Sequence, residues 1–264
     1  MQDLTYSYGS QAKSALFEVS LTVQRGQKVA LIGPNGAGKS TLIKLIASML
    51  PLQQGQIEIY GNAVGKCHHR VAYVPQRSDV DWQFPVSVRQ VVMMGRYAHL
   101  GWLKWPGKVD REAVQNALEQ MGMADFADRQ IGELSGGQQQ RVMLARTLAQ
   151  NADLVLMDEP LNNLDVPTQE LIFHVLEDLT AEGKTVIVST HDLGVLPIHF
   201  NRAIFLDQRV ISDGSVEEVL TAETLARAYG VRLCTDPETG AVTVEQLVNN
   251  RPVSRGDTHG QLFD

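Results

Sequence analysis

Cysteine is scarce in this sequence: Cys67 and Cys234 are the two in 264 residues, and they lie far apart. A disulfide framework is therefore not expected, and a reducing cytoplasm fits better. No apolar run approaches the ~20 residues that a membrane-spanning helix needs. The first residues have neither the basic start nor the apolar stretch of a signal peptide. We therefore expect a protein of the cytosolic compartment that meets a membrane only from its side or through a partner.

Positive charge is also in short supply. Lys and Arg number 23 against 30 Asp and Glu, which gives a formal net charge of −7. Neutralising the phosphates of a nucleic acid needs a basic face, so this balance argues against a nucleic-acid partner. Apolar residues make up 44% of the chain, which is ordinary for a globular protein. The length suits one large domain, or a core with an inserted subdomain.

The chain contains a complete glycine-rich phosphate loop of the form G-x-x-x-x-G-K-[ST]. A buried strand is predicted before it and a helix after it, so backbone N–H groups and a helix N-terminus would face a phosphate chain. Lys39 would supply charge to the outer phosphates, and the Ser40 hydroxyl would hold Mg²⁺. An ordinary glycine turn would need neither residue. The predicted nucleotide-binding loop is Gly33, Pro34, Asn35, Gly36, Ala37, Gly38, Lys39, Ser40 and Thr41.

Apolar strands alternate with helices along much of the chain, which predicts an α/β fold with a mainly parallel sheet covered on both faces. The block between about residues 77 and 150 interrupts this alternation, and we expect an inserted helical subdomain there. Its helices are predicted near 110–123 and 139–150. The predicted strands are 3–8, 16–23, 28–32, 56–60, 71–74, 154–157 and 185–188, with a closing hairpin at 204–211.

Two carboxylates, Asp158 and Glu159, end one of the buried strands, where α/β sheets place their ligands. Adjacent residues on a strand point to different sides, so we expect them to take different roles. Asp158 would help to hold Mg²⁺, directly or through water. Glu159 would orient and polarise the water that attacks the γ-phosphate. Such a pair alone is more often a solvated strand end, and its presence in a chain with a phosphate loop is what favours a catalytic site.

The pentapeptide Leu-Ser-Gly-Gly-Gln at 134–138 opens a predicted helix and forms a second anion-binding N-terminus. Letter for letter, it resembles the signature of the ATP-binding subunits of ABC transporters. The resemblance covers residues 4 to about 230. It implies a P-loop NTPase core with an antiparallel β subdomain and the helical insertion. It also implies a head-to-tail dimer with ATP between the protomers, in which the γ-phosphate held by one subunit is bound by Ser135, Gly136, Gly137 and Gln138 of the other.

Further residues match the family's marks in the expected order. Gln76 resembles the Q-loop glutamine, which senses Mg²⁺ and the attacking water and hinges the helical subdomain. His191 resembles the switch histidine near the γ-phosphate. Asp165 matches the D-loop aspartate that communicates across the dimer. Tyr8 is the first candidate for an aromatic platform under adenine, and Tyr6 is the second.

The region between Gln76 and the signature also resembles the manganese, zinc and iron group of bacterial metal importers. The similar stretches are 74–78, 80–86, 94–97 and 129–134. This resemblance implies that the subunit itself meets only ATP and Mg²⁺. It implies polytopic permease subunits as partners, a metal-binding protein outside the cell, and a peripheral position on the cytoplasmic face of the inner membrane. One departure is Leu-Asn-Asn-Leu-Asp at 161–165, where such importers often carry smaller residues before the aspartate.

Several alternatives stay open. The transported metal is not readable from the sequence, and the subunit could pair with itself or with a paralogue. Cys67-His68-His69 is expected to be a solvated loop, because three adjacent residues cannot all face one ion. A soluble ABC ATPase of iron–sulfur assembly or translation is the rival function, since Asn162-Asn163-Leu164-Asp165 faintly resembles the translation group. We expect an ATPase domain over 1–230 and an extension over 231–264 with a flexible end.

Overall fold

The computed structural model describes residues 1–9, 14–100, 104–229, 231–235 and 242–246. The chain divides into two compact units, Met1–Val219 and Leu220–Asp264. The expected domain boundary near residue 230 stays a prediction. The described elements of the second unit are the helix α8 Ala222–Tyr229 and the antiparallel pair β12 Val231–Thr235 and β13 Val242–Gln246.

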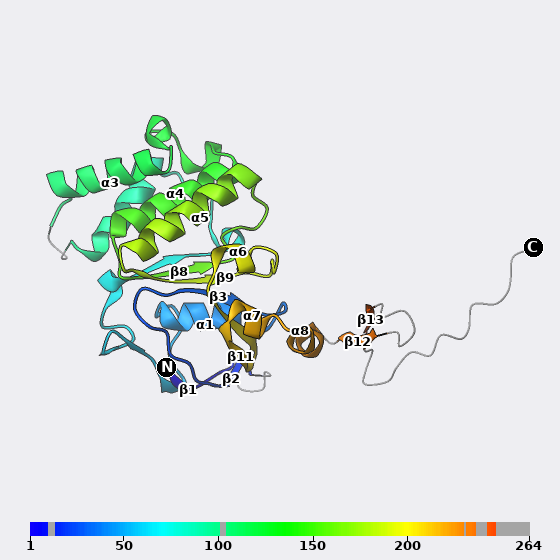
Figure 1. Cartoon of the computed structure of the whole chain (residues 1–264). Coiled ribbons are helices and arrows are strands. Elements are labelled where there is room, and N and C mark those ends of the chain that lie inside the picture. The colour runs from blue at the N-terminus through cyan, green and yellow to red at the C-terminus, as the bar shows by residue number, and fades with distance from the viewer. Residues whose placement is uncertain (10–13, 101–103, 230, 236–241, 247–264) are drawn as a thin grey trace, which may run out of the picture. The chain divides into compact units, whose positions relative to one another are not determined.

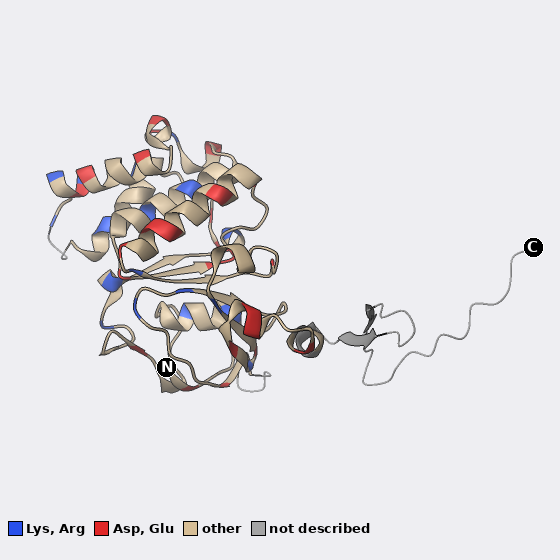
Figure 2. Cartoon of the chain, viewed as in Figure 1, with Lys and Arg blue, Asp and Glu red and all other residues tan. Residues whose placement is uncertain are grey.

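A six-stranded sheet forms the centre of the first unit (Figure 1). Its order is β11-β10-β3-β9-β8-β7, and every neighbouring pair is parallel except β10 and β11. Its inner strands are runs of apolar residues, as expected for strands buried on both faces, and charged residues stand at strand ends (Figure 2). The strands are β3 Lys28–Ile32, β7 Val71–Val74, β8 Leu154–Asp158, β9 Thr185–Ser189, β10 Arg202–Asp207 and β11 Arg209–Ser215.

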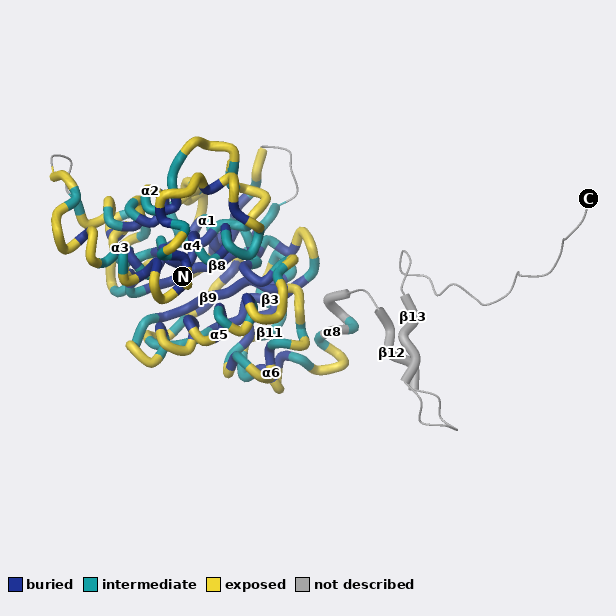
Figure 3. The backbone as a smooth tube through the Cα atoms, turned by 90° about the horizontal axis from the view of Figure 1, so that it is seen from above, coloured by how far each residue is buried: buried dark blue, intermediate teal, exposed yellow. Residues whose placement is uncertain are grey.

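Helices cover both faces of this sheet (Figure 1), and the strands between them are mostly buried (Figure 3). The helix α1 lies on one face, where Leu42 and Ile43 pack into a core with Leu4 of the antiparallel strands. The helix α5 lies on the other face and buries Ile172 and Leu176. These helices, with two short ones, are α1 Lys39–Ile46, α5 Val166–Ala181, α6 Leu196–His199 and α7 Val216–Val219. The predicted P-loop NTPase fold is confirmed.

A three-stranded antiparallel sheet of order β2-β1-β4 lies beside α1, and a short β5–β6 hairpin follows it in the chain. The strand predicted at 16–23 ends at Val19, although Leu21 beyond it is buried. The strand predicted at 56–60 is split at Ile57, because the segment before it pairs with β1 and the segment after it pairs with β6. These elements are β1 Gln2–Tyr6, β2 Leu16–Val19, β4 Gln54–Gln56, β5 Glu58–Ile59 and β6 Asn62–Ala63.

Helices dominate the segment between β7 and β8, where α4 packs against both α2 and α3. In α3, Val114 and Leu118 are buried, as the predicted apolar face requires. None of the helices among the described residues is long and apolar enough to cross a membrane. The helices are α2 Val88–Met94, α3 Lys108–Gln120 and α4 Gly136–Gln150; the 3₁₀ turns are η1 His68–Arg70, η2 Arg77–Asp79, η3 Gly95–Ala98, η4 Ala124–Phe126 and η5 Ile131–Glu133.

Candidate functional site

Glycines shape the loop that joins β3 to α1. Gly33 has φ +149°, and a Cβ there would lie 2.0 Å from the carbonyl oxygen of Leu206, so no side chain fits. Gly38, directly before α1, has φ +94°, a value that favours glycine. The loop therefore takes a path close to the end of the sheet, and α1 begins at Lys39. This is the geometry that directs a helix N-terminus toward an anion.

The Lys39 side chain is buried within the loop. Its Nζ donates hydrogen bonds to the carbonyl oxygens of Gly33, at 2.7 Å, and Pro34, at 3.0 Å. Burial lowers the pKa of Lys39, and the nearby Glu159 and Asp158 carboxylates act in the opposite direction. The ammonium group is thus placed near both the phosphate loop and the carboxylates of Asp158 and Glu159.

Tyr8 lies beside the first turn of α1. Its hydroxyl is 3.0 Å from the Thr41 hydroxyl, and 63% of the residue's surface is exposed. Tyr6 is only 6% exposed and packs edge-on against Tyr8, with ring centroids 5.2 Å apart. An adenine platform needs an accessible ring face next to the phosphate loop. Of the two candidates, Tyr8 offers that face.

Asp158 is the last residue of β8 and Glu159 follows it; both contact Ser189 at the end of β9. The Ser189 hydroxyl donates to Asp158 Oδ1 at 2.6 Å, and it accepts a hydrogen bond from the Glu159 backbone N–H at 2.9 Å. Asp158 is fully buried, and its Oδ2 is without a hydrogen-bond partner in the described part of the chain. An unpaired buried carboxylate oxygen beside a phosphate loop suits a ligand of Mg²⁺, or of water bound to it.

The Glu159 carboxylate is surrounded by polar side chains from distant parts of the sequence. Gln76 Nε2 donates to its Oε2 at 3.3 Å, and the Asn162 amide donates to the same oxygen. His191 Nδ1 lies 3.8 Å from the other oxygen, Oε1. These side chains come from the segments that follow β7, β8 and β9, three neighbouring parallel strands whose carboxyl ends meet at one edge.

The signature segment begins α4. Ser135 caps the helix: its Oγ accepts from the Gln138 N–H at 3.4 Å, and Gln138 Oε1 accepts from the Ser135 N–H at 2.9 Å. Gly136 lies against the Arg77 guanidinium, and a Cβ on Gly137 would contact the Thr168 hydroxyl at 3.3 Å. Among the described residues, no hydrogen bond joins this segment to the phosphate loop of the same chain.

Asp165 caps α5, with its Oδ1 accepting from the Thr168 N–H at 2.8 Å. Hydrogen bonds from the side chain and backbone of Thr168 lower the pKa of Asp165. Arg141 on α4 donates from Nη2 to Thr168 Oγ1 at 3.0 Å. The start of α5 is therefore joined to the signature helix.

Comparison with known proteins shows the family of this chain. A family model described as ABC transporter matches residues 16–162. The zinc transport system ATP-binding protein TroB of Treponema pallidum is 48% identical over 233 residues, which is 88% of this chain and 87% of that protein. This chain belongs to the ABC transporter family. The ABC ATPase is also 47% identical to the manganese transport system ATP-binding protein MntB of Bacillus subtilis, over 88% of this chain and 92% of that protein.

Solved structures agree with the fold of this ABC ATPase. An ATP-binding cassette solved as a dimer with ADP and Pi superposes with a TM-score of 0.71 at 28% identity, covering 81% of this chain and 96% of that one. The family resemblance expected from the signature is thus confirmed. So is ATP hydrolysis as the activity class, because the chain carries the complete fold of these ATPases and the motifs quoted above.

The structure adds site residues that the sequence did not single out. Two closely follow Gln76 in the sequence: Arg77 donates to Gln139 Oε1 of α4 at 3.2 Å, and Asp79 pairs with Lys44 of α1 at 2.8 Å. The others are Ser189, Asn162 and Thr168, already placed beside Asp158, Glu159 and Asp165. For Arg77 and Asp79 the only available signal was adjacency to Gln76, and for Asn162 it was the departure from the family pattern.

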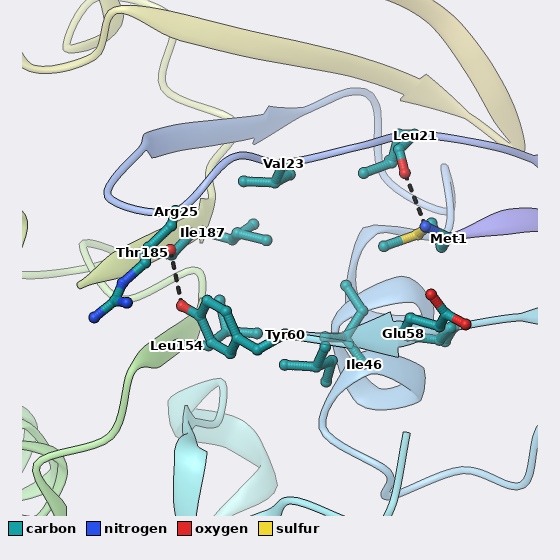
Figure 4. A pocket seen from close by; sticks show the side chains of 12 residues that line it. Met1, Leu21, Val23, Arg25, Ile46, Glu58, Tyr60, Leu154, Thr185 and Ile187 are labelled. Carbon is teal, nitrogen blue, oxygen red and sulfur yellow. Dashed lines mark hydrogen bonds between the residues drawn. The ribbon is translucent and has the colours of Figure 1, made fainter. Parts of the chain in front are cut away.

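Two other features of the ABC ATPase lie apart from this site. A cavity of about 220 Å³ with a mixed apolar and polar lining lies between the antiparallel strands and the central sheet, lined by Met1, Leu21, Tyr60, Ile187, Arg25 and Glu58 among others (Figure 4). None of the predicted site residues lines it. Cys67 is buried, and no group of three or more His, Cys, Asp and Glu residues in the described part of the chain could hold a metal ion.

Proposed function

We propose that this ABC ATPase is the energy-supplying subunit of an importer of divalent metal ions of the manganese, zinc and iron class. The observation that carries the proposal is the identity of 47–48% with the zinc and manganese transport subunits over 88% of the chain. That span includes the helical segment between β7 and β8, well beyond the ATP-binding motifs alone. Proteins of one fold host many functions, so the identity over this whole span, rather than the fold, supports the transporter class.

The phosphate loop binds ATP through its backbone and Lys39. The Lys39 ammonium donates hydrogen bonds to two carbonyl oxygens of the loop. An outer phosphate of bound ATP would replace these oxygens with a charged acceptor. Tyr8, exposed beside Thr41, would stack on the adenine ring. The loop residues after Pro34, which itself has no N–H group, offer backbone N–H groups to the phosphates.

Ser40, Asp158 and Gln76 are the residues that would hold Mg²⁺, directly or through water. The unpaired, buried Oδ2 of Asp158 fits this role. Bound Mg²⁺ neutralises negative charge on the β- and γ-phosphates. On the protein side, Ser189 keeps the Asp158 carboxylate oriented by its hydrogen bond to Oδ1.

Glu159 positions the attacking water and accepts its proton as the bond to the γ-phosphorus forms. Its backbone N–H is held by Ser189, and its carboxylate is held by Gln76. His191, exposed on the next strand end, faces the same carboxylate and would contact the γ-phosphate. The chemistry is in-line displacement of ADP by water, with stabilisation by positioned charges.

The site is completed by a second copy of the chain. Ser135, Gly136, Gly137 and Gln138 start α4 and make no hydrogen bond to their own phosphate loop within the described residues, so they are free to meet a nucleotide held by a partner. Asp165 is linked to this helix by hydrogen bonds through Thr168, and it would contact the partner subunit at the same interface. A related cassette solved as a dimer with ADP and Pi supports this arrangement.

The partner in the membrane would dock on the helical segment. Large apolar side chains are exposed there: Trp105 is 91% exposed, and Tyr97, Phe84 and Met94 are also exposed. Such side chains suit a groove for an amphipathic helix of a polytopic permease. The ATPase would then lie on the cytoplasmic face of the inner membrane, and a metal-binding protein outside the cell would deliver the ion.

The test is to purify the tagged full chain from detergent-solubilised membranes of its host and to assay ATPase activity in the product. We expect a polytopic membrane protein in the eluate, and ATPase activity that a metal-loaded binding protein stimulates. A Lys39→Ala variant purified in the same way is the control, because its complex should form without the activity. A partner-free soluble dimer, or ribosomes or iron–sulfur assembly proteins in the eluate, would contradict the importer and favour a soluble ABC ATPase.

A further inference from the structure

The two oxygens of the Glu159 carboxylate have different surroundings. Oε2 accepts hydrogen bonds from two side-chain amides, those of Gln76 and Asn162. Oε1 faces the imidazole of His191, 3.8 Å away. One oxygen is therefore held by two donors, while the other is open to a proton that arrives from water.

Local backbone structure places Asn162 on Glu159. Glu159 adopts φ +49°, and its carbonyl oxygen accepts a hydrogen bond from the Asn162 N–H at 3.4 Å, which closes a four-residue turn. Leu161 within the turn is buried, and its carbonyl oxygen accepts from Gln169 Nε2 of α5 at 3.2 Å. The turn is thus held against α5, and the Asn162 side chain has a fixed origin beside the carboxylate.

The chemistry of Asn162 matters for this contact. An amide N–H₂ group donates, whereas the carboxylate of an aspartate cannot donate when ionised and would repel Glu159. Asn163, the next residue, is exposed and takes a left-handed conformation, so the two asparagines are not equivalent.

We propose that Asn162 is a positioning residue which, together with Gln76, holds Oε2 of Glu159 so that Oε1 is the oxygen that takes the proton from the attacking water. This inference rests on the role proposed for Glu159. In the step itself the water oxygen bonds to the γ-phosphorus, the bond from phosphorus to the ADP oxygen breaks, and the water proton passes to Oε1. The pair of amides prevents the carboxylate from turning during this transfer.

The experiment compares steady-state ATP hydrolysis by the full-length protein and by Asn162→Ala and Asn162→Asp. Losing a donor to a charged group should lower kcat about tenfold in Asn162→Ala, and more in Asn162→Asp, which keeps the shape but repels Glu159. KM and the affinity for Mg-ATP should stay within twofold, because Asn162 is not placed on the nucleotide. Asn201→Ala, at an exposed asparagine far along the chain, should match the wild type.

Two further measurements separate the possible failures. Thermal unfolding of Asn162→Ala should match the wild type within a few degrees, so a lowered kcat cannot be ascribed to misfolding. If Glu159→Gln is inactive and Asn162→Ala keeps a wild-type or higher kcat, the positioning role is wrong while the base assignment stands. If Glu159→Gln hydrolyses ATP at the wild-type rate, the proposed role of Glu159 is wrong, and the inference falls with it.

Discussion

The guanidinium of Arg77 lies against Gly136, the first residue of the signature helix, so closely that a Cβ on Gly136 would be 2.7 Å from Arg77 Cζ. The same guanidinium donates to Gln139 one turn further along that helix. Arg77 directly follows Gln76, which donates to the Glu159 carboxylate. One short segment therefore contacts both the carboxylate proposed to be catalytic in one site and the helix that would serve the partner's site.

Replacing Arg77 with alanine should lower the ATPase kcat about tenfold, because the signature helix loses a charged hydrogen-bond donor that fixes its position relative to Gln76. Binding of ATP to the phosphate loop should be unchanged. Measuring kcat together with the affinity for a fluorescent nucleotide separates an effect on turnover from an effect on binding. Arg89→Ala is the matched control, since Arg89 pairs with Asp128 on the exposed surface. An unaltered kcat in Arg77→Ala would contradict the link.

Gly136→Ala should reproduce the Arg77→Ala phenotype without loss of folding stability. The new methyl group would meet the far end of a flexible side chain, so Arg77 moves aside and gives up Gln139. Combining both substitutions should then cost little more than either alone, which a double-mutant cycle of ATPase rates measures. Fully additive losses would mean that the two residues act independently.

Two glycines of the phosphate loop should differ sharply when changed to alanine. At Gly33 a Cβ would lie 2.0 Å from the backbone oxygen of Leu206, which cannot move aside, so we expect a loss of about 3 kcal/mol or more in the free energy of unfolding. At Gly36, where φ is +80° but the space is open, the cost should be about 1 kcal/mol. Urea unfolding of the two variants makes the comparison. Equal losses would show that the backbone at Gly33 yields.

The stability of the helical segment should depend on pH through Asp110. The Gly107 N–H and the Arg96 guanidinium hydrogen-bond its carboxylate and lower the pKa of Asp110. A lowered folded-state pKa means that this contribution is present above about pH 4 and is lost as the pH falls through the folded pKa. Asp110→Asn should therefore lower the unfolding temperature at neutral pH, and the gap to the wild type should narrow below about pH 4.

Asp128→Asn is the control for this pH experiment. Asp128 also pairs with an arginine, Arg89, but both side chains are exposed. Exposed ion pairs contribute roughly 0–1 kcal/mol, so this variant should follow the wild-type curve at every pH. A gap between Asp110→Asn and the wild type that stays constant from neutral to acid pH would show that the Asp110 charge contributes nothing.

Much of the fold follows from local patterns. The glycine loop, the apolar strands and the helix with Val114 and Leu118 on one face were predictable, because each is encoded within a few consecutive residues. The strand predicted to run to residue 23 ends at Val19, where the regular ladder with β1 stops, although Leu21 is buried and still exchanges two hydrogen bonds with Met1. The alternation of apolar residues predicts which face of a segment is buried, whereas pairing into a sheet depends on the segment that lies beside it.

The site was predictable only in part, for a related reason. Parallel strand ends meet at one edge, so the positions of Gln76, Glu159 and His191 could be expected to converge. The contact between Arg77 and Gln139 spans 62 residues and depends on side-chain conformations that no local pattern encodes. Asn162 and Glu159 are only three residues apart, but their contact needs the left-handed backbone of Glu159, which is unusual for a residue other than glycine.

The most direct test of the central claim is ATP turnover and assembly state in Glu159→Gln. If Glu159 is the base at a site completed by a second copy, the variant should bind Mg-ATP, lose hydrolysis by at least about a hundredfold, and elute as a dimer in gel filtration with ATP. The wild type should return to monomers as ATP is consumed. Hydrolysis by Glu159→Gln at the wild-type rate, or ATP binding without dimer formation, would contradict the account.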